Sequence, residues 1–435
     1  MKFETAPPRG MRDLLPREVE LRDRAAATIL ATYTTYGFRR IETPALESLG
    51  LLLGSEGGEN EKLVFKVLKR GAKLESVTSH REDDLADLGL RFDLTVPLAR
   101  YYAHHRSELP DPFKAIQIGP VWRAERPQKG RFRQFTQCDI DVLGVASEVA
   151  EIELILATAE ALLALGLERP TIRLNDRRLL TAVAAHCGFD AARQADVFVT
   201  LDKLDKIGRE GVERELRLAG HDERAISRLF ALVVPSADPS ERTAAFERLG
   251  GAMPAVREVV EGLRTIARTV EREAGPRYGV VLDPTLVRGM GYYTGPIFEA
   301  TAQGSASSIA GGGRYDRMLG RLLGEDVPAC GFSIGFERVV AILEAKSGAS
   351  RPERDRIALL FDESDALEEV IAAANRLRKE ARVVSMTLKR KNLARQLDEL
   401  AREGFGAYAV FRARAGAPEV KPLVARAPDA RRADA

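Results

Sequence analysis

Hydrophobic positions in the first third of the chain recur with both helical and strand periods. From Arg17 onward, apolar residues return every three to four positions among Glu and Arg, which predicts an amphipathic helix, and Glu148–Leu165 predicts a second. Shorter apolar runs bounded by polar linkers predict strands at Phe38–Pro44, Val64–Leu68, Leu90–Leu94, Ala115–Glu125 and Gln134–Gly144. The last two flank the charged loop Arg126–Arg133, so we expect them to pair as an antiparallel hairpin.

The pattern changes twice further along the chain. Residues 179–272 are rich in helix formers and predict a separate insertion of short helices, at Asp202–Gly208, Glu213–Ala219 and Ala225–Leu232. Strands return at Val280–Leu282, Tyr292–Ala300 and Ser307–Ala310, before the helix Phe336–Lys346. After the linker Ser347–Arg354, strands at 357–361, 383–388 and 407–411 alternate with helices at 366–381 and 393–403, which predicts a small sheet with parallel pairing.

Composition limits the classes of protein that fit. The 435 residues carry 66 Lys and Arg against 64 Asp and Glu, a net charge of +2, so any nucleic-acid surface must be a local patch. The three cysteines stand far apart without CxxC spacing, which argues against a disulfide framework and a thiolate zinc site. The sequence contains no signal-peptide core and no apolar run of about 18 residues. We therefore expect a soluble, cytoplasmic protein that does not enter a membrane.

The densest cluster of charge lies in the predicted hairpin, in the segment VWRAERPQKGRFRQFTQCDID at residues 121–141. Five cationic side chains surround Glu125, and strand alternation directs Glu125 to the same face as Arg123. Guanidinium groups suit phosphate because their planar fork donates two parallel hydrogen bonds. A solvated basic loop is the alternative, so this segment alone leaves both interpretations open.

Three further segments combine glycine with polar side chains. LVRGMGYYTGPIFEA, residues 286–300, sets Arg288 and two tyrosines beside glycines that permit close approach to a ligand, although the tyrosines could equally pack in a core. In AGGGRYDRML, residues 310–319, three successive glycines would bring the backbone close to another group and set Arg314 at a helix start, although a tight structural turn is the favoured interpretation of this segment alone. The segment lacks the P-loop and dinucleotide patterns. GFSIGFERVVAIL, residues 331–343, predicts a strand with an open face before a helix whose Arg338 could reach a polyphosphate or pair on the surface.

Acidic residues provide the remaining candidates. Asp93 follows a predicted strand, and Asp139 and Asp141 alternate on one face of the second hairpin strand. Paired carboxylates would suit an amine or an imidazole, whereas ordinary edge-strand charge is the alternative. None of the five histidines has metal-ligand spacing, and no nucleophilic triad can be argued from the sequence.

Taken together and in this order, these segments resemble the histidyl-tRNA synthetase family of class II aminoacyl-tRNA synthetases. Residues 37–47, GFRRIETPALE, resemble motif 1, residues 121–141 motif 2, and residues 331–338, GFSIGFER, motif 3. LVRGMGYYTG and AGGGRYD resemble the two histidine-specific signatures, and PPRGMRDLLP near the N-terminus also fits. The resemblance extends from about Pro7 to Ala345. Two departures are Gly291, where the family often has Asp, and Asp141, where many members have Glu.

The resemblance implies an α+β fold, in which an antiparallel sheet flanked by helices carries a helical insertion and a C-terminal α/β domain. It implies four parts: catalytic residues 1–178 and 273–346, the insertion 179–272, and an anticodon-binding-like domain at 355–435. It also implies ATP-dependent activation of L-histidine to histidyl-adenylate and transfer to tRNA(His) by a homodimer, with Mg²⁺ bound mainly through the nucleotide. Lys389, Arg390 and Lys391 would be a contact for the tRNA backbone.

Site residues follow from the same resemblance. Arg123 and Arg288 would be catalytic and would contact both the α-phosphate and the histidine carboxylate. The other ATP contacts would be Glu125, Arg131, Phe135 and Arg338. Histidine would be held by Asp93, Thr95 and Gln137 at its amino group and by Asp141, Tyr292 and Tyr293 at its imidazole. The alternative is a non-catalytic regulatory subunit of ATP phosphoribosyltransferase that senses histidine. Retention of Arg123, Arg288 and Arg338, and of an α/β region after the linker, favours the enzyme.

Overall fold

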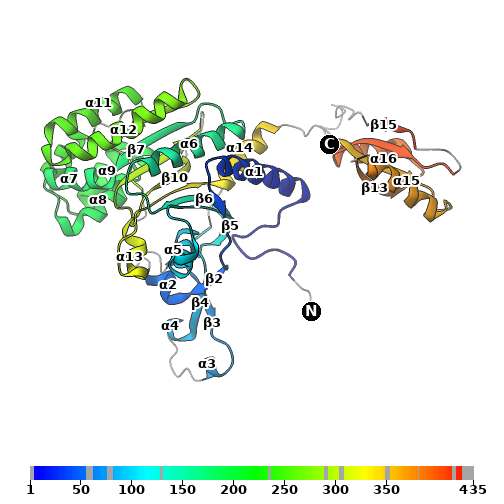
Figure 1. Cartoon of the computed structure of the whole chain (residues 1–435), viewed down its shortest axis with the longest axis horizontal. Coiled ribbons are helices and arrows are strands. Elements are labelled where there is room, and N and C mark those ends of the chain that lie inside the picture. Colours follow the sequence, from blue (N-terminus) through cyan, green and yellow to red (C-terminus); the bar gives the residue numbers. More distant parts are fainter. Residues whose placement is uncertain are drawn as a thin grey trace. The chain divides into compact units, whose positions relative to one another are not determined.

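The computed structural model describes residues 4–54, 62–75, 82–127, 131–233, 236, 238–288, 292–302, 308–347, 353–380, 382–413 and 418–423. The chain folds as two compact units, Met1–Glu344 and Ala345–Ala435 (Figure 1). Each unit has hydrophobic clusters of its own. Gly289 and Gly291, in the segment LVRGMGYYTGPIFEA, lie outside the described residues.

A sheet of eight strands forms the centre of the first unit. Neighbouring strands are antiparallel except at the two edges, where the outermost strand pairs in parallel. In spatial order the strands are β1 (Arg39–Arg40), β5 (Phe113–Trp122), β6 (Gln134–Leu143), β11 (Ala329–Ile334), β10 (Ser308–Arg314), β9 (Pro296–Thr301), β7 (Thr171–Asp176) and β8 (Gly279–Leu282). The predicted antiparallel α+β fold and the 115–144 hairpin are therefore confirmed.

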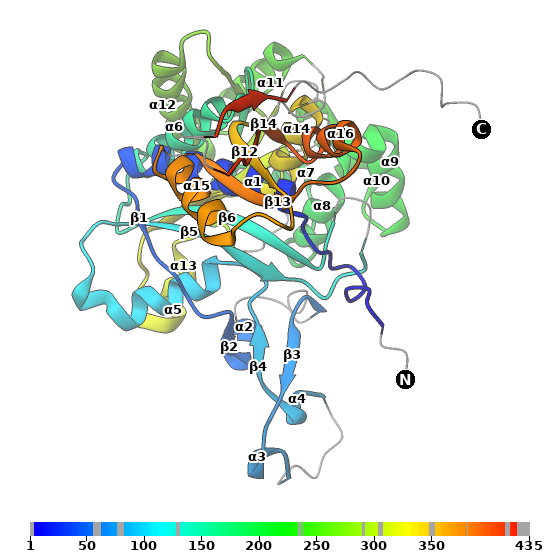
Figure 2. The same ribbon diagram turned by 90° about the vertical axis from the view of Figure 1, so that its right-hand side faces the viewer.

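Helices α1 (Pro16–Thr35) and α6 (Val149–Ala164) pack against one another and against strands of the large sheet. Their apolar stripes supply Ile29, Tyr33 and Leu154 to the main core. The other helices of the catalytic part are α5 (Thr95–His105), α13 (Arg317–Leu323) and α14 (Phe336–Ser347). A small antiparallel sheet of β2 (Leu46–Ser48), β4 (Ala86–Leu90) and β3 (Phe65–Leu68) projects from the large one, with short helices α2 (Leu49–Gly54), α3 (Ala72–Glu75) and α4 (Glu82–Leu85) (Figure 2).

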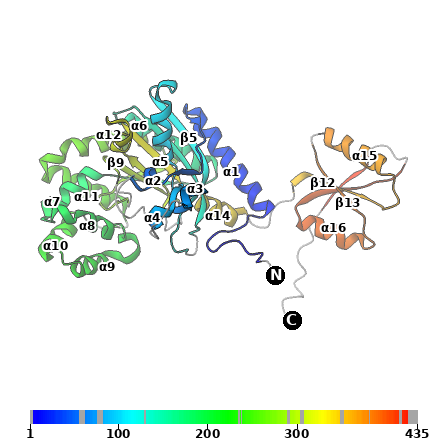
Figure 3. The ribbon, with the colours of Figure 1, turned by 90° about the horizontal axis from the view of Figure 1, so that it is seen from below.

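The segment between β7 and β8 is helical and gathers at the end of the sheet away from α1 (Figure 3). Its helices are α7 (Arg177–Cys187), α8 (Gln194–Leu201), α9 (Leu204–Leu218), α10 (Glu223–Leu232), α11 (Pro239–Ala252) and α12 (Arg257–Ala274). Gly208, at φ 68°, breaks α9 near its start. These helices share the main core of the first unit. The division of that unit into insertion and catalytic parts remains a prediction.

Several sequence-based boundaries were wrong. Of the predicted strand Leu90–Leu94, only Leu90 belongs to β4, which ends there. Phe92 and Leu94 are buried, and Asp93 accepts a hydrogen bond of 3.1 Å from the backbone of Val96 in the first turn of α5. Apolar residues at the start of a buried helix thus imitated a strand. Likewise Tyr292 precedes β9, which begins only at Pro296.

The glycine run at 310–319 is also different from the expected turn. Gly311–Gly313 lie inside β10, between two neighbouring strands, and Arg314 is the last residue of that strand. Arg314 makes a two-pronged ion pair of 2.6 and 2.8 Å with the buried Glu151 of α6. It therefore fastens α6 to the sheet, which is a structural role.

The second unit contains the predicted alternation of strands and helices. Strands β13 (Val383–Leu388), β12 (Glu353–Phe361) and β14 (Phe405–Val410) are parallel, and β15 (Val420–Pro422) adds an antiparallel edge. Helices α15 (Leu367–Lys379) and α16 (Leu393–Arg402) contribute to separate clusters with β12. In the basic run at its surface, Lys389 pairs with Asp362 and Arg390 with Glu399, so part of that charge is already neutralised.

Candidate active site

A cleft of about 380 Å³ opens in the first unit, a volume typical of small-molecule sites. Its walls come from the segment before α5, the β5–β6 hairpin, β10, β11 and the start of α14. All twelve residues predicted for the site line it: Asp93, Thr95, Arg123, Glu125, Arg131, Phe135, Gln137, Asp141, Arg288, Tyr292, Tyr293 and Arg338. The structure thus brings them together, whereas their individual roles remain proposals.

Strand register explains why polar residues far apart in the chain share one face. Asp139 of β6 lies opposite Ser333 of β11, Ser333 opposite Gly311 of β10, and Gly311 opposite Glu299 of β9. Glu299 in turn lies opposite Arg173 of β7. Because directly paired residues point to the same side of a sheet, these positions form one row across it. The row begins inside the cleft and continues beyond it.

Glycines in this face make room for charged side chains. A Cβ atom on Gly311 would lie 2.3 Å from the guanidinium carbon of Arg288, and one on Gly331 would lie 2.0 Å from Oδ1 of Asp141. A Cβ on Gly312 would lie 2.0 Å from the carbonyl oxygen of Gly331. Within strand β10, the missing side chains of this glycine run therefore let charged side chains and the neighbouring strand come close.

One group of cleft residues is acidic and deeply buried. Asp93, Asp139 and Asp141 each retain an oxygen that has no hydrogen-bond partner. Burial raises the pKa of Asp93 to about 6 and that of Asp141 to about 7. Burial, together with the charge of Asp141, also raises the pKa of Asp139 well above its usual range. Among the described residues none of the three forms an ion pair, although the charge of Arg123 counters part of the rise in the pKa of Asp93 and of Asp139. Their unpartnered oxygens suit a ligand that brings positive charge and N–H donors.

Three tyrosines line the cleft together with the acidic residues. Tyr315 donates a hydrogen bond of 2.5 Å from its hydroxyl to Oδ1 of Asp141, which leaves Oδ2 free. The rings of Tyr292 and Tyr293 lie 4.8 Å apart, and both line the cleft although they are largely buried. Core packing and contact with a ligand are therefore compatible for this pair. Sequence reasoning omitted Tyr315, whose place in GGGRYD was the only available signal.

The second group of cleft residues is cationic. The Nε of Arg123 donates to the carbonyl of Phe92 at 3.0 Å, and its guanidinium lies 5.0 Å from the ring of Phe135. Burial and the positive charges of Arg131 and Arg288 lower the pKa of Arg338. Mutual repulsion of this kind is relieved when a polyanion binds among the cations.

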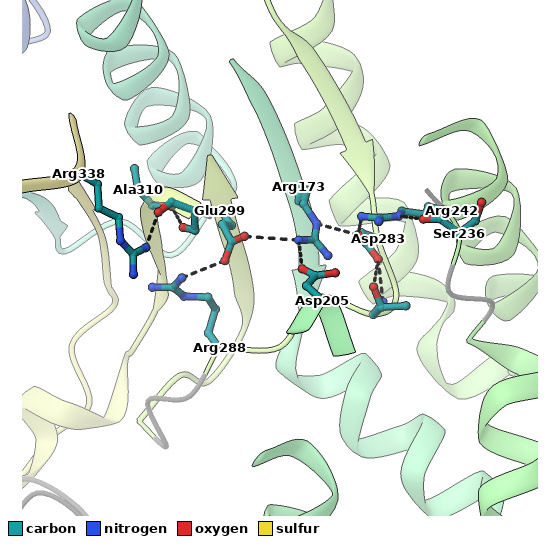
Figure 4. A network of polar contacts seen from close by, with 11 residues as sticks. Arg173, Asp205, Ser236, Arg242, Asp283, Arg288, Glu299, Ala310 and Arg338 are labelled. Carbon is teal, nitrogen blue, oxygen red and sulfur yellow. Dashed lines mark hydrogen bonds and ion pairs between the residues drawn. The ribbon is translucent and has the colours of Figure 1, made fainter. Parts of the chain in front are cut away.

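Arg288 is held from outside the cleft. Its guanidinium pairs with Glu299 at 3.1 Å, while its Nε is buried without a partner (Figure 4). Burial disfavours its charge, but the interactions with Tyr293 and Glu299 outweigh that effect and raise its pKa. Arg288 thus remains charged, and 26% of its side chain is exposed. Glu299 was absent from the sequence-based candidates.

Glu337, at the start of α14, orders the surrounding motifs. It accepts hydrogen bonds of 2.7 Å from Arg22 of α1 to each oxygen, and one of 3.0 Å from the backbone of Thr136 in β6. Burial would raise its pKa, but these partners and the nearby Arg12 lower it overall. This carboxylate therefore stays ionised and fixes the position of the neighbouring Arg338.

The described residues contain neither a metal-binding cluster nor a membrane-spanning helix. In the parts of the chain that the structure describes, no group of three or more His, Cys, Asp or Glu side chains is arranged to hold a metal ion. Among the same residues, no helix is both long and apolar enough to cross a lipid bilayer.

The fold and this cleft are those of an aminoacyl-tRNA synthetase. A crystal structure of histidyl-tRNA synthetase from Nostoc sp. PCC 7120 matches 97% of this chain and 95% of its own, with a TM-score of 0.78 and 27% identity. A structure described as an ATP phosphoribosyltransferase regulatory subunit/histidyl-tRNA synthetase from Bacillus halodurans shares the fold, with a TM-score of 0.73 at 21% identity over 95% of this chain and 100% of its own.

Residues 10–339 match the family described as Histidyl-tRNA synthetase, and the chain belongs to that family. It is 47% identical to a histidine–tRNA ligase of Leifsonia xyli, over 97% of this chain and 99% of the relative. It is 41% identical to a probable histidine–tRNA ligase of Tropheryma whipplei, over 93% and 95%. The prediction of a histidine–tRNA ligase is therefore confirmed, in preference to a regulatory subunit of ATP phosphoribosyltransferase.

Proposed function

We propose that the cleft joins L-histidine to ATP, forming histidyl-adenylate and releasing pyrophosphate, and then passes the histidyl group to tRNA(His). The observation that carries this proposal is the presence, in one cleft, of buried carboxylates with unpartnered oxygens and of arginines that repel one another. Histidine brings an ammonium group and an imidazole, and ATP brings a polyanion. The two substrates together supply the charges that both groups of residues lack.

Arg123 and Arg288 are assigned to the chemical step. The carboxylate of histidine attacks the α-phosphorus of ATP, and pyrophosphate leaves from the opposite side. Two anions must therefore approach, and the guanidinium groups lower that repulsion without having to reorganise as charge develops. Glu299 supports this role by keeping Arg288 in place. No protein base is required, because a carboxylate is already the nucleophile.

Histidine is assigned to the acidic part of the cleft. Asp93, Thr95 and Gln137 would receive its ammonium group, and Asp141 and Tyr293 would bind the two imidazole nitrogens, with Tyr292 alongside. Tyr315 supports the assignment because it occupies Oδ1 of Asp141 and leaves Oδ2 for an imidazole N–H. A donor and an acceptor at opposed ring nitrogens distinguish imidazole from other side chains.

ATP is assigned to the cationic part of the cleft. Phe135 would stack on adenine, Glu125 and Arg131 would hold adenine and phosphate, and Arg338 would bind the γ-phosphate. The ion pair between Arg131 and Glu125, 3.7 Å in the free protein, is weak enough to be rearranged by the nucleotide. Mg²⁺, bound mainly through the phosphates, would neutralise further charge on them.

The assembled protein is assigned to the cytoplasm as a homodimer that binds tRNA. The motif 1 segment at residues 37–47 supports dimerisation, because it forms β1 at the edge of the large sheet, where a partner has access. The second unit, with its parallel sheet and Lys389–Lys391 run, is assigned to anticodon recognition.

Histidine-dependent exchange of pyrophosphate into ATP tests the proposal directly on the full chain. Exchange with histidine, and none with the other amino acids, is the expected result. Absence of exchange despite saturable histidine binding would contradict the proposed adenylate chemistry.

A further inference from the structure

A chain of charged side chains leads from Arg288 to the helices between β7 and β8 (Figure 4). Glu299 pairs with Arg288 through Oε2 at 3.1 Å and with Arg173 through Oε1 at 3.4 Å. Arg173 also contacts Asp283 at 2.8 Å and Asp205, near the start of α9, at 2.8 Å. The catalytic arginine and the helical segment are therefore linked through one carboxylate and one guanidinium.

Arg173 is too deeply buried to be an ordinary surface ion. Its side chain is 9% exposed, and that of Asp283 is fully buried. Asp283 is already occupied, since Arg242 of α11 pairs with it at 2.6 Å and Thr285 donates to its other oxygen. A buried charge of this kind requires a complete set of partners. Asp205 and Glu299 complete that set for Arg173.

Asp205 and Glu299 share a single donor group of Arg173. Both accept from Nη1, Asp205 at 2.8 Å and Glu299 at the longer distance of 3.4 Å. Nη1 carries two hydrogens and can donate to both carboxylates, so Asp205, Glu299 and Asp283 together balance the positive charge of Arg173. Loss of the charge on Asp205 would leave more of that positive charge to Glu299 and draw its carboxylate away from Arg288.

Asp202, three residues before Asp205, also interacts electrostatically with Arg288. Burial raises the pKa of the Asp202 carboxyl group, and the positive charge of Arg288 counters part of that rise. Two acidic residues near the junction of α8 and α9 therefore interact with Arg288 or with Arg173.

We infer that Arg173 and Asp205 are positioning residues for adenylate formation, which set the place of Arg288 through Glu299 and so tie the helical segment to the chemical step. The inference rests on the proposed role of Arg288. Neither residue touches a substrate, so both act on the rate of the reaction with bound substrates rather than on substrate affinity.

The test is pyrophosphate exchange by the full-length chain carrying Asp205→Asn. We expect kcat to fall about three- to tenfold, the range for coupling through a packed network, while KM for histidine and for ATP stays unchanged. Glu215→Gln is the matched control, since Glu215 is on the same helix and pairs only with Lys203 at 2.6 Å among the ion pairs of the described residues. It should leave kcat unchanged.

A combination with Arg288→Ala separates positioning from a general effect on structure. If Asp205 acts through Arg288, then Asp205→Asn should cost nothing further once Arg288 is removed. The same loss in both backgrounds, or a loss equal to that of Glu215→Gln, would overturn the inference. Asp205 is about half exposed, so its amide variant should fold, and Arg173→Lys should show the same pattern more strongly.

Arg288→Ala and Asp205→Asn test separate roles, and their outcomes can be distinguished. If Arg288→Ala alone leaves exchange unchanged, the proposed role of Arg288 is wrong and the inference falls with it. If Arg288→Ala abolishes most exchange but Asp205→Asn has no effect, only the inference is overturned.

Discussion

Asp93 and Asp141 are held in an environment that disfavours their negative charge until a cation arrives. Each has a pKa raised by burial, to about 6 and about 7 respectively. A raised pKa means that the folded protein binds more protons than the unfolded chain between about pH 4 and 7. The two protonated carboxyl groups therefore contribute fully to the free energy of unfolding at low pH, and this contribution is lost as pH rises through their pKa values. Binding of histidine should restore the lost stability, because its positive charge compensates the ionised carboxylates.

This reasoning predicts how pH affects stabilisation by histidine. The rise in melting temperature on adding histidine should grow between pH 5.5 and 7.5, because the two carboxylates ionise over that range. Asp93→Asn and Asp141→Asn should reduce the rise and flatten its pH dependence, with about 2–5 kcal/mol of binding lost. Differential scanning fluorimetry measures this.

Ionisation of the free imidazole affects every variant equally, so the differences between variants isolate the protein groups. Asp87→Asn, at a partly exposed carboxylate paired with Lys73, serves as the control. A pH dependence unchanged in both cleft variants would contradict the assignment of these carboxylates to histidine.

Arg288 provides the second prediction at this scale. Arg288→Ala should lower kcat of exchange roughly 10²–10³-fold, the effect of losing one preorganised electrostatic contact to a transition state. The protein should remain folded by circular dichroism. Arg178→Ala, which removes a guanidinium paired with Asp176 outside the cleft, should leave kcat unchanged. Normal turnover in Arg288→Ala would refute its catalytic role.

The sequence revealed individual site residues only where a motif marked them. Arg123 and Arg338 stood in dense signatures, and the structure places both in the cleft. Glu299 lies in the segment 286–300 but was not singled out within it, and Arg173 lies in no motif. Their contact depends on which strands become neighbours across the sheet. Tyr315 similarly reaches Asp141 from a different strand region. Register is set by the whole sheet, so local patterns cannot supply these contacts.

At the scale of elements, glycines in the central strands leave space that charged side chains of the cleft occupy. Gly311 admits Arg288, and Gly331 admits Asp141, on adjacent strands β10 and β11. The two glycines therefore serve different substrates under the proposed assignment: Gly311 the α-phosphate through Arg288, and Gly331 the imidazole through Asp141.

Alanine at each position should separate these effects. Gly311→Ala should lower kcat by displacing Arg288, and Gly331→Ala should mainly raise KM for histidine, each by about tenfold or more, as for small misplacements of a site. Steady-state exchange kinetics measure both parameters. Gly279→Ala in β8, where no atom lies within 4 Å of the added Cβ, is the control. Equal effects of the two cleft variants on both parameters would contradict the assignment.

Elements with a clear period were predicted well, and elements defined by packing were not. The helix at 149–164 and the strand at 383–388 agree closely with expectation, since each has an unbroken pattern over its length. For the run Gly311–Gly313 the sequence favours a turn, because glycine commonly marks turns, with close approach of the backbone as the other interpretation. The structure shows close approach inside β10, and the groups that approach, Arg288 and the neighbouring strand, are defined only by packing.

At the scale of the whole molecule, the two units have hydrophobic clusters that share no residue. The cleft and every residue assigned to adenylate formation lie in Met1–Glu344. The second unit therefore contributes no residue assigned to adenylate formation. This is consistent with its proposed separate role in tRNA binding.

Removal of Arg354–Ala435 tests this division. Pyrophosphate exchange should remain near that of the full chain, whereas aminoacylation of tRNA(His) should fall by orders of magnitude because anticodon contacts are lost. Filter assays with labelled histidine measure the charging. Undiminished charging would show that the second unit does not read the anticodon, and a thermal unfolding profile of the truncated chain would confirm that its first unit is intact.

The position of β11 has a consequence for how the protein is made on the ribosome. Residues 329–334 form the last strand of the large sheet to be synthesised, yet they lie between β6 and β10 near its middle. Until they emerge from the ribosomal tunnel, β6 and β10 each present an unpaired edge, which is a site for aggregation. The nascent chain therefore cannot complete its cleft until residues 329–338 have left the tunnel.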